Sequence, residues 1–553
     1  MSNAESSLPR YAASVAVAKP AVRDEPRGAG AAVQELGEQP PVRWREMLAV
    51  GLLVALCDVT IYRGEGFGGL ALLTAVAPGL LLLGNPRRWL GASTWIVGGM
   101  LFLLAARMVW LGSALAAAAG FALLAGFSLA LHGGRPYVLD VLVHALQTIG
   151  SGFQGLVRYL RSVARFGPQI PRILWLNLAL PLGALVAFGA LFVLANPDLM
   201  TSFTEAASRF FRALRDWIEG FAENLWEVAF WLLVAWIAAG LLRPLLGRSL
   251  LAAWWPESHI EDGNEGESKE SPFYTALRNT LVAVIVLFAV YLVFEFRTLW
   301  FRDFPEGFYY AGYAHEGAAW LTAALALATL VLSLIFRGQV LADPRLGSLR
   351  KLAWIWSAEN LVLALTVYNR MYIYVDFNGM TRMRTIGLFG ISAVLLGFCL
   401  VLWKILYNRG FAWLIERQLW TLAIAVYLFA LTPVDALVHS YNVRRVLAGD
   451  LAPSVQISVH PINSEGILVL GRLLNCQDEI IREGVRAMLA ERAIQGERLA
   501  GERAKLGWTS YQIADHLLLK RLRAAREDWK EYVDASKRAA AIERFDKYAY
   551  QWY

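Results

Sequence analysis

The chain has 553 residues, of which 57% are hydrophobic and 18% are charged, and its formal net charge at pH 7 is +7. Globular proteins average about 45–50% apolar and about 25% charged residues, so this composition excludes an ordinary soluble protein. In a membrane protein, basic residues mainly set orientation, so the modest positive charge argues against a nucleic-acid partner. The three cysteines show no C-x-x-C spacing, which predicts neither a disulfide framework nor a metal site, and no cofactor is expected.

Apolar sequence begins only near Met47, after a leader rich in Ala, Pro, Glu and Arg that shows no hydrophobic periodicity. We therefore expect residues 1–46 to form a disordered cytoplasmic tail. Beyond it, apolar residues are grouped into blocks of about 18–22, the length of a helix that crosses a bilayer. The sequence predicts an all-α polytopic integral membrane protein with about eleven transmembrane helices. The expected spans are 47–62, 67–84, 90–110, 114–131, 173–195, 226–243, 278–296, 317–336, 353–373, 386–404 and 419–437.

Lysine and arginine are more frequent in one alternating set of predicted loops, which includes 135–172, 243–278 and 337–351. Cytoplasmic loops carry such an excess, so the N-terminus and the richer set of loops are expected in the cytoplasm. An odd number of spans then places the C-terminal tail on the other side of the membrane. One span more or fewer would invert that assignment.

The alternation of apolar and polar segments predicts four parts beyond the leader. Residues 47–131 form a first four-helix membrane segment, residues 132–172 an amphipathic cytoplasmic linker, and residues 173–437 the main membrane domain. The linker is either a helix lying on the membrane surface or an ordinary connection between spans. Residues 438–553 lack long apolar runs, but apolar side chains recur there at helical spacing. We expect a small helical soluble domain that needs a partner surface, either its own spans or another protein.

The predicted span 353–373 carries side chains that a lipid-facing helix would not tolerate without a reason. At about 100° per residue, Glu359, Thr366 and Arg370 fall within about 20° of one another on a helix. Glu359 and Arg370 are separated along the helix axis by about 16 Å, so each needs a partner on another helix. This stripe can fix helix register, line an ion or proton path in which Glu359 titrates, or form part of a ligand or catalytic pocket. The candidate intramembrane residues are Glu359, Asn360, Thr366 and Arg370, with Asp58 as a further member and Asp58 and Asp435 as candidate partners.

A second polar group follows that span, in a loop on the outer side of the expected topology. Asn378-Gly379 is a turn signal, and two arginines just beyond it run against the positive-inside trend. Those arginines could bind an anionic headgroup, phosphate or carboxylate, or they could pair with Asp376, Glu306 or Glu316. The candidate outer-face residues are Tyr374, Asp376, Arg382, Arg384, Asp435, Asn442 and Arg444.

Three segments, Tyr310–Gly317, Tyr368–Arg384 and Thr432–Arg444, resemble a known family. The family is a bacterial polytopic membrane family classed as domain of unknown function 4173, with its relative 4153, and the resemblance covers roughly residues 170–460. It implies a multi-pass protein of the bacterial inner membrane, and it implies no activity. Thr432 departs from the Asn expected before the proline. The resemblance maps one family run onto Tyr374, Gly379, Thr381 and Arg384 (or Arg382), and a second onto Pro433, Asp435, Tyr441, Asn442 and Arg444.

The sequence contains no G-x-S-x-G, Walker-type loop or dinucleotide fingerprint, so no catalytic residue is predicted. The favoured function is a non-enzymatic envelope scaffold or sensor whose C-terminal domain, residues 438–553, meets a protein partner. One alternative is a transporter or channel that uses the polar stripe around Glu359. A second alternative is an envelope lipid- or glycan-modifying enzyme that uses Asp376, Arg382, Arg384 and Asp435. In each case the lipid bilayer is the surrounding partner.

Overall fold

The computed structural model describes residues 41–85, 90–164, 180–189, 197–244, 270–300, 310–336, 340, 343–407 and 409–552. Within these ranges every regular element is a helix. Eight of the described helices are long and apolar enough to cross a membrane. The predicted fold class, an all-α polytopic membrane protein with a helical C-terminal domain, is therefore confirmed. Most of the predicted disordered leader lies outside the described residues.

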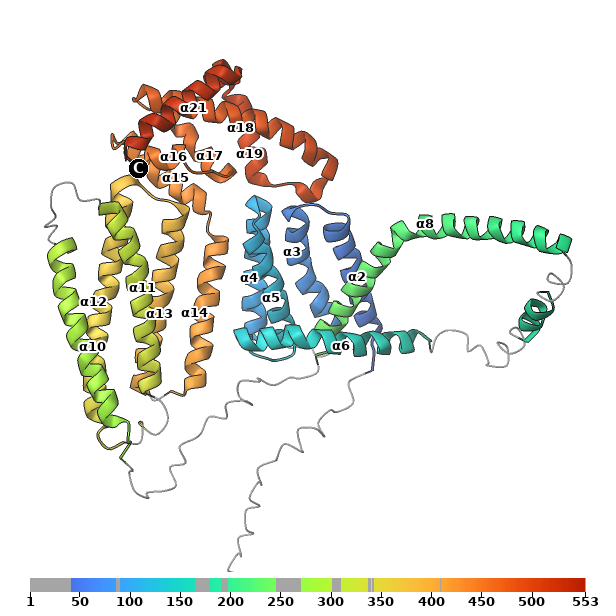
Figure 1. The fold of residues 1–553 in the computed structure, drawn as a ribbon, viewed down its shortest axis with the longest axis horizontal. Helices are drawn as coiled ribbons and strands as arrows, with labels where there is room; N and C mark the ends of the chain where they lie inside the picture. Colours follow the sequence, from blue (N-terminus) through green and yellow to red (C-terminus); the bar gives the residue numbers. More distant parts are fainter. Residues whose placement is uncertain are drawn as a thin grey trace, which may run out of the picture. The chain divides into compact units, whose positions relative to one another are not determined.

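Four consecutive helices open the described chain and pack as neighbours (Figure 1). The first continues beyond its α-helical part as a π-helical turn over Asp58–Tyr62, so together these match the short first span. The last begins at an N-cap, where the Ser113 side chain accepts a hydrogen bond from the Ala116 amide at 3.2 Å. These helices are α2 (Trp44–Cys57), α3 (Phe67–Gly84), α4 (Ala92–Leu111) and α5 (Ala114–Leu131).

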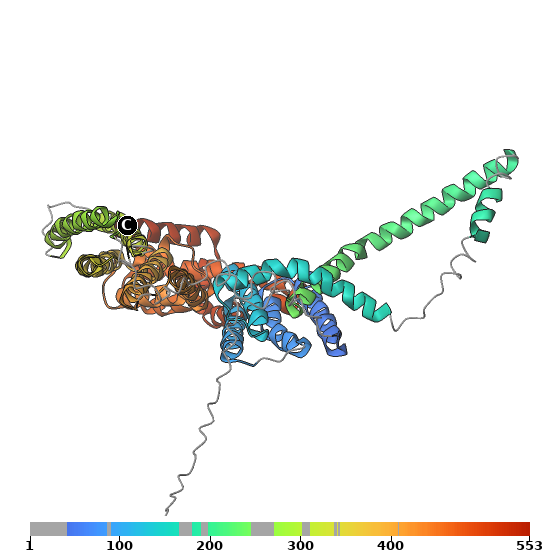
Figure 2. The ribbon, with the colours of Figure 1, turned by 90° about the horizontal axis from the view of Figure 1, so that it is seen from below.

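Helix α6 (Val138–Ala164) runs across α4 and α5 rather than alongside them (Figures 1 and 2). It packs on the last turns of α8 (Pro197–Leu242), the helix that contains the predicted span 226–243. Glycines allow the two backbones to approach, because a Cβ at Gly152 would clash with Trp236 and one at Gly240 with Thr148. Helix α6 thus buries small and polar residues in protein and exposes an apolar stripe, which consists of Leu142, Leu146, Ile149, Phe153 and Leu160.

Five further membrane helices form a second group around a common apolar core. Within that core the Trp356 ring meets the Phe288 ring edge-on, with the ring centroids 5.7 Å apart. Helix α12, which carries the predicted polar stripe, has 33 residues. At about 1.5 Å per residue it is longer than the roughly 30 Å hydrocarbon layer. The group comprises α10 (Tyr274–Glu295), α11 (Tyr310–Ile335), α12 (Leu346–Asn378), α13 (Arg382–Tyr407) and α14 (Phe411–Leu431).

The end of the last predicted span, 419–437, is wrong. Helix α14 stops at Leu431, and a new helix, α15 (Val434–Leu447), begins after Pro433. Proline has no amide hydrogen to continue the helix and disfavours helical backbone in the residue before it. Asp435 therefore lies in the first turn of α15 and not at the end of a membrane span.

The expected total of eleven spans stays a prediction. Helices α2 and α12 coincide with predicted spans in addition to the eight apolar helices already mentioned. Of the predicted span 173–195, residues 180–189 form a short apolar helix and the remainder lies outside the described residues.

The C-terminal domain is a helical unit with a hydrophobic core of its own, and it begins with α15 at Val434 rather than at residue 438. Ile481 and Val485 of one helix pack there with Leu522 and Phe545 of two others. Helices α18 and α21 approach closely at Gly484, where the absence of a Cβ leaves room for Phe545. Its principal helices after α15 are α16 (Ser454–Ser458), α17 (Ser464–Leu470), α18 (Glu479–Leu506), α19 (Ile513–Ala524) and α21 (Ala535–Ala549), with a short 3-10 turn, η5 (Trp508–Ser510), before α19.

Candidate functional site

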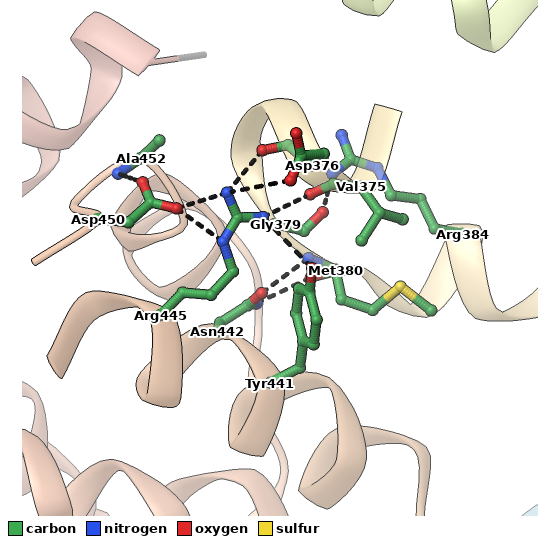
Figure 3. A network of polar contacts seen from close by, with 10 residues as sticks. All are labelled: Val375, Asp376, Gly379, Met380, Arg384, Tyr441, Asn442, Arg445, Asp450 and Ala452. Atoms are coloured by element: carbon green, nitrogen blue, oxygen red, sulfur yellow. Dashed lines mark hydrogen bonds and ion pairs between the residues drawn. The ribbon is translucent and has the colours of Figure 1, made fainter. Parts of the chain in front are cut away.

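The loop between α12 and α13, residues 379–381, is held by a side chain of α15 (Figure 3). Asn442 Oδ1 accepts a hydrogen bond from the Met380 amide at 2.7 Å, and Asn442 Nδ2 donates to the Met380 carbonyl at 2.9 Å. Gly379 has φ = 97°, and a Cβ there would lie 2.6 Å from Asn442 Oδ1 and 2.8 Å from the Pro453 Cβ. The backbone conformation and the close contact both require glycine at this turn.

Arg445, also on α15, covers the C-terminal end of α12. Its Nη1 donates to the Val375 carbonyl at 2.9 Å and its Nη2 to the Asp376 carbonyl at 2.6 Å. Its Nε donates to Asp450 Oδ2 at 2.7 Å (Figure 3). The last carbonyls of a helix lack partners within the helix and carry partial negative charge, so a guanidinium there both satisfies and neutralises them.

Arg384 is buried against the same loop. Its guanidinium carbon lies 3.6 Å from the centroid of the Tyr374 ring, a cation–π contact, and its Nη1 donates to the Gly379 carbonyl. The side chain of Arg384 therefore binds groups of its own chain, and its burial keeps an external anion from reaching it.

Arg382, the first residue of α13, forms a two-pronged ion pair with Asp435 of α15. The Asn463 amide donates to the same carboxylate at 2.8 Å. Burial alone would raise the pKa of Asp435, but the hydrogen bonds from Arg382 and Asn463 outweigh it, and the pKa lies below its ordinary value. One turn further on, burial disfavours the charged imidazole and lowers the pKa of His439 to about 4, with repulsion from Arg382 acting in the same direction.

The C-terminal domain is also tied to the first group of membrane helices. Near the end of α4, Arg107 Nη1 lies 2.7 Å from Glu465 Oε1 of α17. In the loop between α2 and α3, the Glu65 amide donates to Thr509 Oγ1 of η5 at 3.1 Å. The C-terminal domain thus contacts the first helix group through α4 and the α2–α3 loop, and it contacts the second helix group through α13.

Within the second helix group, the buried Arg370 finds its partner on α10. Its Nε donates to Glu295 Oε1 at 2.7 Å and its Nη2 to Glu295 Oε2 at 2.5 Å. The Tyr291 hydroxyl donates to the same carboxylate at 2.9 Å. On α11, a Cβ at Gly317 would clash with the guanidinium, so glycine makes room for it.

A family model described as Domain of unknown function (DUF4153) matches residues 48–460. The chain belongs to the DUF4153 family. The match begins near the start of α2, well before the residue 170 suggested by the motifs. It is a match to family 4153, and the resemblance to family 4173 stays a prediction. Comparison with curated proteins and with solved structures gave no match. Because the DUF4153 match ends at residue 460, the helices from α17 onward lie beyond it.

Six of the seven predicted outer-face residues of this DUF4153 protein make contacts among α12, α13, the loop between them and α15, and the Arg382–Asp435 pair is separate from the contacts drawn in Figure 3. Arg444 is exposed, and its side chain makes no polar contact with the described residues. Its neighbour Arg445, which the sequence reasoning missed, makes the contacts instead. Asp376 takes part through its carbonyl, while its carboxylate lies 4.0 Å from Arg445. The side chains of Glu306 and Glu316, named as possible arginine partners, lie outside the described residues. The residues brought together are Tyr374, Asp376, Arg382, Arg384, Asp435 and Asn442.

The predicted intramembrane residues do not form one site. Asp58 accepts a hydrogen bond from Trp231 Nε1 at 2.9 Å and pairs with Arg63, also at 2.9 Å. Asp58 and Asp435, the candidate partners of the polar stripe, do not pair with it, because Asp58 binds Arg63 and Asp435 binds Arg382. The partner of Arg370 is Glu295, the last residue of α10. It lies at the end of an apolar block, where no helical periodicity of polar residues points to it.

The remaining stripe residues make contacts mainly within α12. Thr366 Oγ1 donates to the Leu363 carbonyl at 2.8 Å, and Asn360 Nδ2 donates to the Trp356 carbonyl at 2.8 Å. Asn360 Oδ1 and Glu359 Oε2 are buried, and neither has a hydrogen-bond partner in the described part of the chain. Glu359 thus stands apart from the Arg370–Glu295 pair.

Proposed function

We propose that this DUF4153 protein is a non-enzymatic membrane scaffold or sensor in which the C-terminal helical domain holds two groups of membrane helices together. One observation carries the proposal. A domain with its own hydrophobic core makes ion pairs to both groups, through Arg107–Glu465 on α4 and Arg382–Asp435 on α13. In this proposal the protein's own membrane helices supply the partner surface that the tail needs.

We place the protein in a bacterial inner membrane with its N-terminus in the cytoplasm and its C-terminal domain outside. The distribution of lysine and arginine supports this orientation. The geometry of α2 supports only the separation of the two ends, because Trp44 starts this helix and Glu65, which contacts the C-terminal domain, follows its other end. Helix α6 then lies at the cytoplasmic surface, with its exposed apolar stripe in the lipid.

The same contacts weaken the alternative of an envelope enzyme. Arg382 and Asp435 neutralise each other, and Arg384 is held by Tyr374 and the Gly379 carbonyl. Arg382 is 46% exposed, but Asp435 already neutralises its charge, and Arg384 is buried away from any external substrate. Of the four residues named for that alternative, three are engaged in holding the chain's own elements together.

A transporter or channel remains a second candidate because of Glu359. Its Oε2 and the adjacent Asn360 Oδ1 are buried without hydrogen-bond partners in the described residues. Burial of unpaired polar atoms costs free energy, and polar side chains kept in membrane helices at that cost often serve transport. This candidate predicts that Glu359→Gln abolishes function while the abundance of the protein is retained. A purely structural role predicts an equal loss of abundance and function.

The scaffold proposal is tested by exchanging charges between the domain and α4. Arg107→Glu and Glu465→Arg should each release the C-terminal domain, and the double variant should restore docking. Docking is measured by disulfide formation between cysteines introduced at Glu65 and Thr509, in a protein from which the three native cysteines have been removed. The control is the same exchange in the exposed Arg523–Glu497 pair, which lies within the domain.

The cellular defect caused by deleting the protein should appear in both single exchanges and disappear in the double variant. If the single exchanges undock the domain and the cells behave as wild type, the scaffold proposal is wrong. Point exchanges are preferable to truncation, since deletion of residues 500–553 removes Leu522 and Phe545 from the core of the domain.

A further inference from the structure

The C-terminal domain contains a cavity of about 310 Å³ between the second half of α18 and α19. Its floor is apolar and includes the buried side chains of Leu518 and Leu522. The loop from Gly507 to Gln512 closes one side, with the half-exposed rings of Trp508 and Tyr511 at its edge. A cavity of this size, apolar inside and polar at the rim, has the form of a small-molecule site.

The charges on the wall are not balanced. Arg503 pairs with Asp515, which also accepts a hydrogen bond from the Ser464 hydroxyl. Arg492 donates to the Ile462 carbonyl at 2.7 Å and to Gln495 Oε1 at 3.4 Å, and it forms no ion pair with any carboxylate in the described chain. One guanidinium therefore faces the cavity without a counter-ion, and its electrostatics favour an anionic group.

The cavity is lined by chain neighbours of both residues that tie the domain to the first helix group. Thr509, within the closing loop, accepts the hydrogen bond from the Glu65 amide. Ser464, on the opposite wall, directly precedes Glu465, the partner of Arg107. A Cβ at Gly68 of α3 would lie 2.8 Å from the Thr509 carbonyl, so the loop is seated tightly on the membrane helix. A molecule in the cavity would contact the elements that carry the docking residues.

We propose that this cavity binds a single-chain anionic amphiphile, that is, one carboxylate or phosphate group on an alkyl body, and that its occupancy is linked to docking of the C-terminal domain. The head group lies against Arg492 and the alkyl chain against the leucine floor. The link to docking rests on the scaffold proposal, whereas the binding site does not.

The experiment uses the full-length protein in nanodiscs and octyl phosphate as the probe. Gly496 lines the cavity, and a Cβ there would meet only the Leu519 Cδ1 at 3.4 Å, so Gly496→Phe fills the space. Gly501→Phe is the matched control, because a Cβ at Gly501 on the same helix meets nothing within 4 Å. Arg492→Gln removes the proposed charge partner, and Arg498→Gln, at an exposed position on the same helix, is its control.

We expect Gly496→Phe and Arg492→Gln each to bind octyl phosphate at least about tenfold more weakly than the wild type. Gly496→Phe occupies the space of the alkyl chain, and Arg492→Gln removes a hydrogen bond between charged groups, which is a strong one. The two control variants should bind as the wild type does. Equal affinity in all four variants overturns the site. Equal affinity for octanol overturns the anionic head group, and equal affinity for inorganic phosphate overturns the alkyl chain.

The link to docking is read from the rate of disulfide formation between cysteines at positions 65 and 509, with and without octyl phosphate. A change of at least about twofold, absent in Gly496→Phe, supports the link, and an unchanged rate overturns it. Failure of the scaffold proposal looks different, because octyl phosphate would still bind when exchanges at Arg107 or Glu465 have no cellular effect.

Discussion

The ion pair between Arg370 and Glu295 tests how charge is held inside this membrane domain. The two side chains are 2% and 0% exposed, and each lies on a different helix, α12 or α10. Two short hydrogen bonds join the guanidinium to the carboxylate, and Tyr291 supplies a third donor. Neither charge has access to water, so each depends on the other for its stability.

Removal of one partner leaves the other charge buried and uncompensated. For buried pairs this costs about 3–5 kcal/mol, whereas replacing both partners with apolar groups of similar volume is often close to neutral. We therefore expect Arg370→Met and Glu295→Leu each to lower the free energy of unfolding by about 3–5 kcal/mol. The double variant Arg370→Met/Glu295→Leu should recover most of that loss.

The assay is a double-mutant cycle on thermal unfolding of the purified protein, together with its abundance in membranes. Arg297→Met serves as the control, since Arg297 is an exposed arginine two residues beyond Glu295. The reasoning is refuted if either single variant is as stable as the wild type. It is equally refuted if the double variant is as unstable as the sum of the two single variants.

Three further predictions concern the C-terminal domain and the loop that it holds. Burial lowers the pKa of His439 from 6.5 to about 4, so the folded protein binds fewer protons there than the unfolded chain. The stability of the folded protein should therefore fall by about 3 kcal/mol as pH drops from about 6.5 to about 4. His439→Gln should flatten that slope, and an unchanged slope would point to other groups. Gly379→Ala should destabilise the protein by more than Gly449→Ala. Both glycines have φ = 97°, but only Gly379 has neighbouring atoms where the Cβ would be. Equal losses of stability in thermal unfolding would show that the contact with Asn442 is unimportant. In a protein without native cysteines, Ser536→Cys should react with a membrane-impermeant maleimide in intact cells, and reaction only after permeabilisation would place the C-terminal domain in the cytoplasm.

The membrane helices could be predicted from the sequence because apolar length is a property of each segment alone. One error, the end of the last span, was avoidable. The Thr432-Pro433 step marks a helix boundary, but the apolar residues on both sides of it made the span look continuous. Local backbone chemistry was the better guide there than hydropathy.

The contacts between helices could be predicted only in part. The resemblance to the family singled out Asn442, Asp435 and Arg384, and each of them binds another part of the chain. It pointed to Arg444, whereas Arg445 makes the contacts with the end of α12. Adjacent residues on a helix differ by about 100° in direction, and only the packing decides which one faces the loop. Glu295 was missed for a related reason, since its importance lies in the approach of α10 to α12 and not in its own segment.

The tie between Thr509 and Glu65 joins residues 444 positions apart in the chain. At a synthesis rate of about 5–20 residues per second, the first helices wait roughly 20–90 s for the segment that will cover them. During that interval the α2–α3 loop lacks its eventual partner, and a chain that ends prematurely never acquires it. A segment made late thus completes a structure begun by α2 and α3, so the docked state reports that synthesis has passed Thr509.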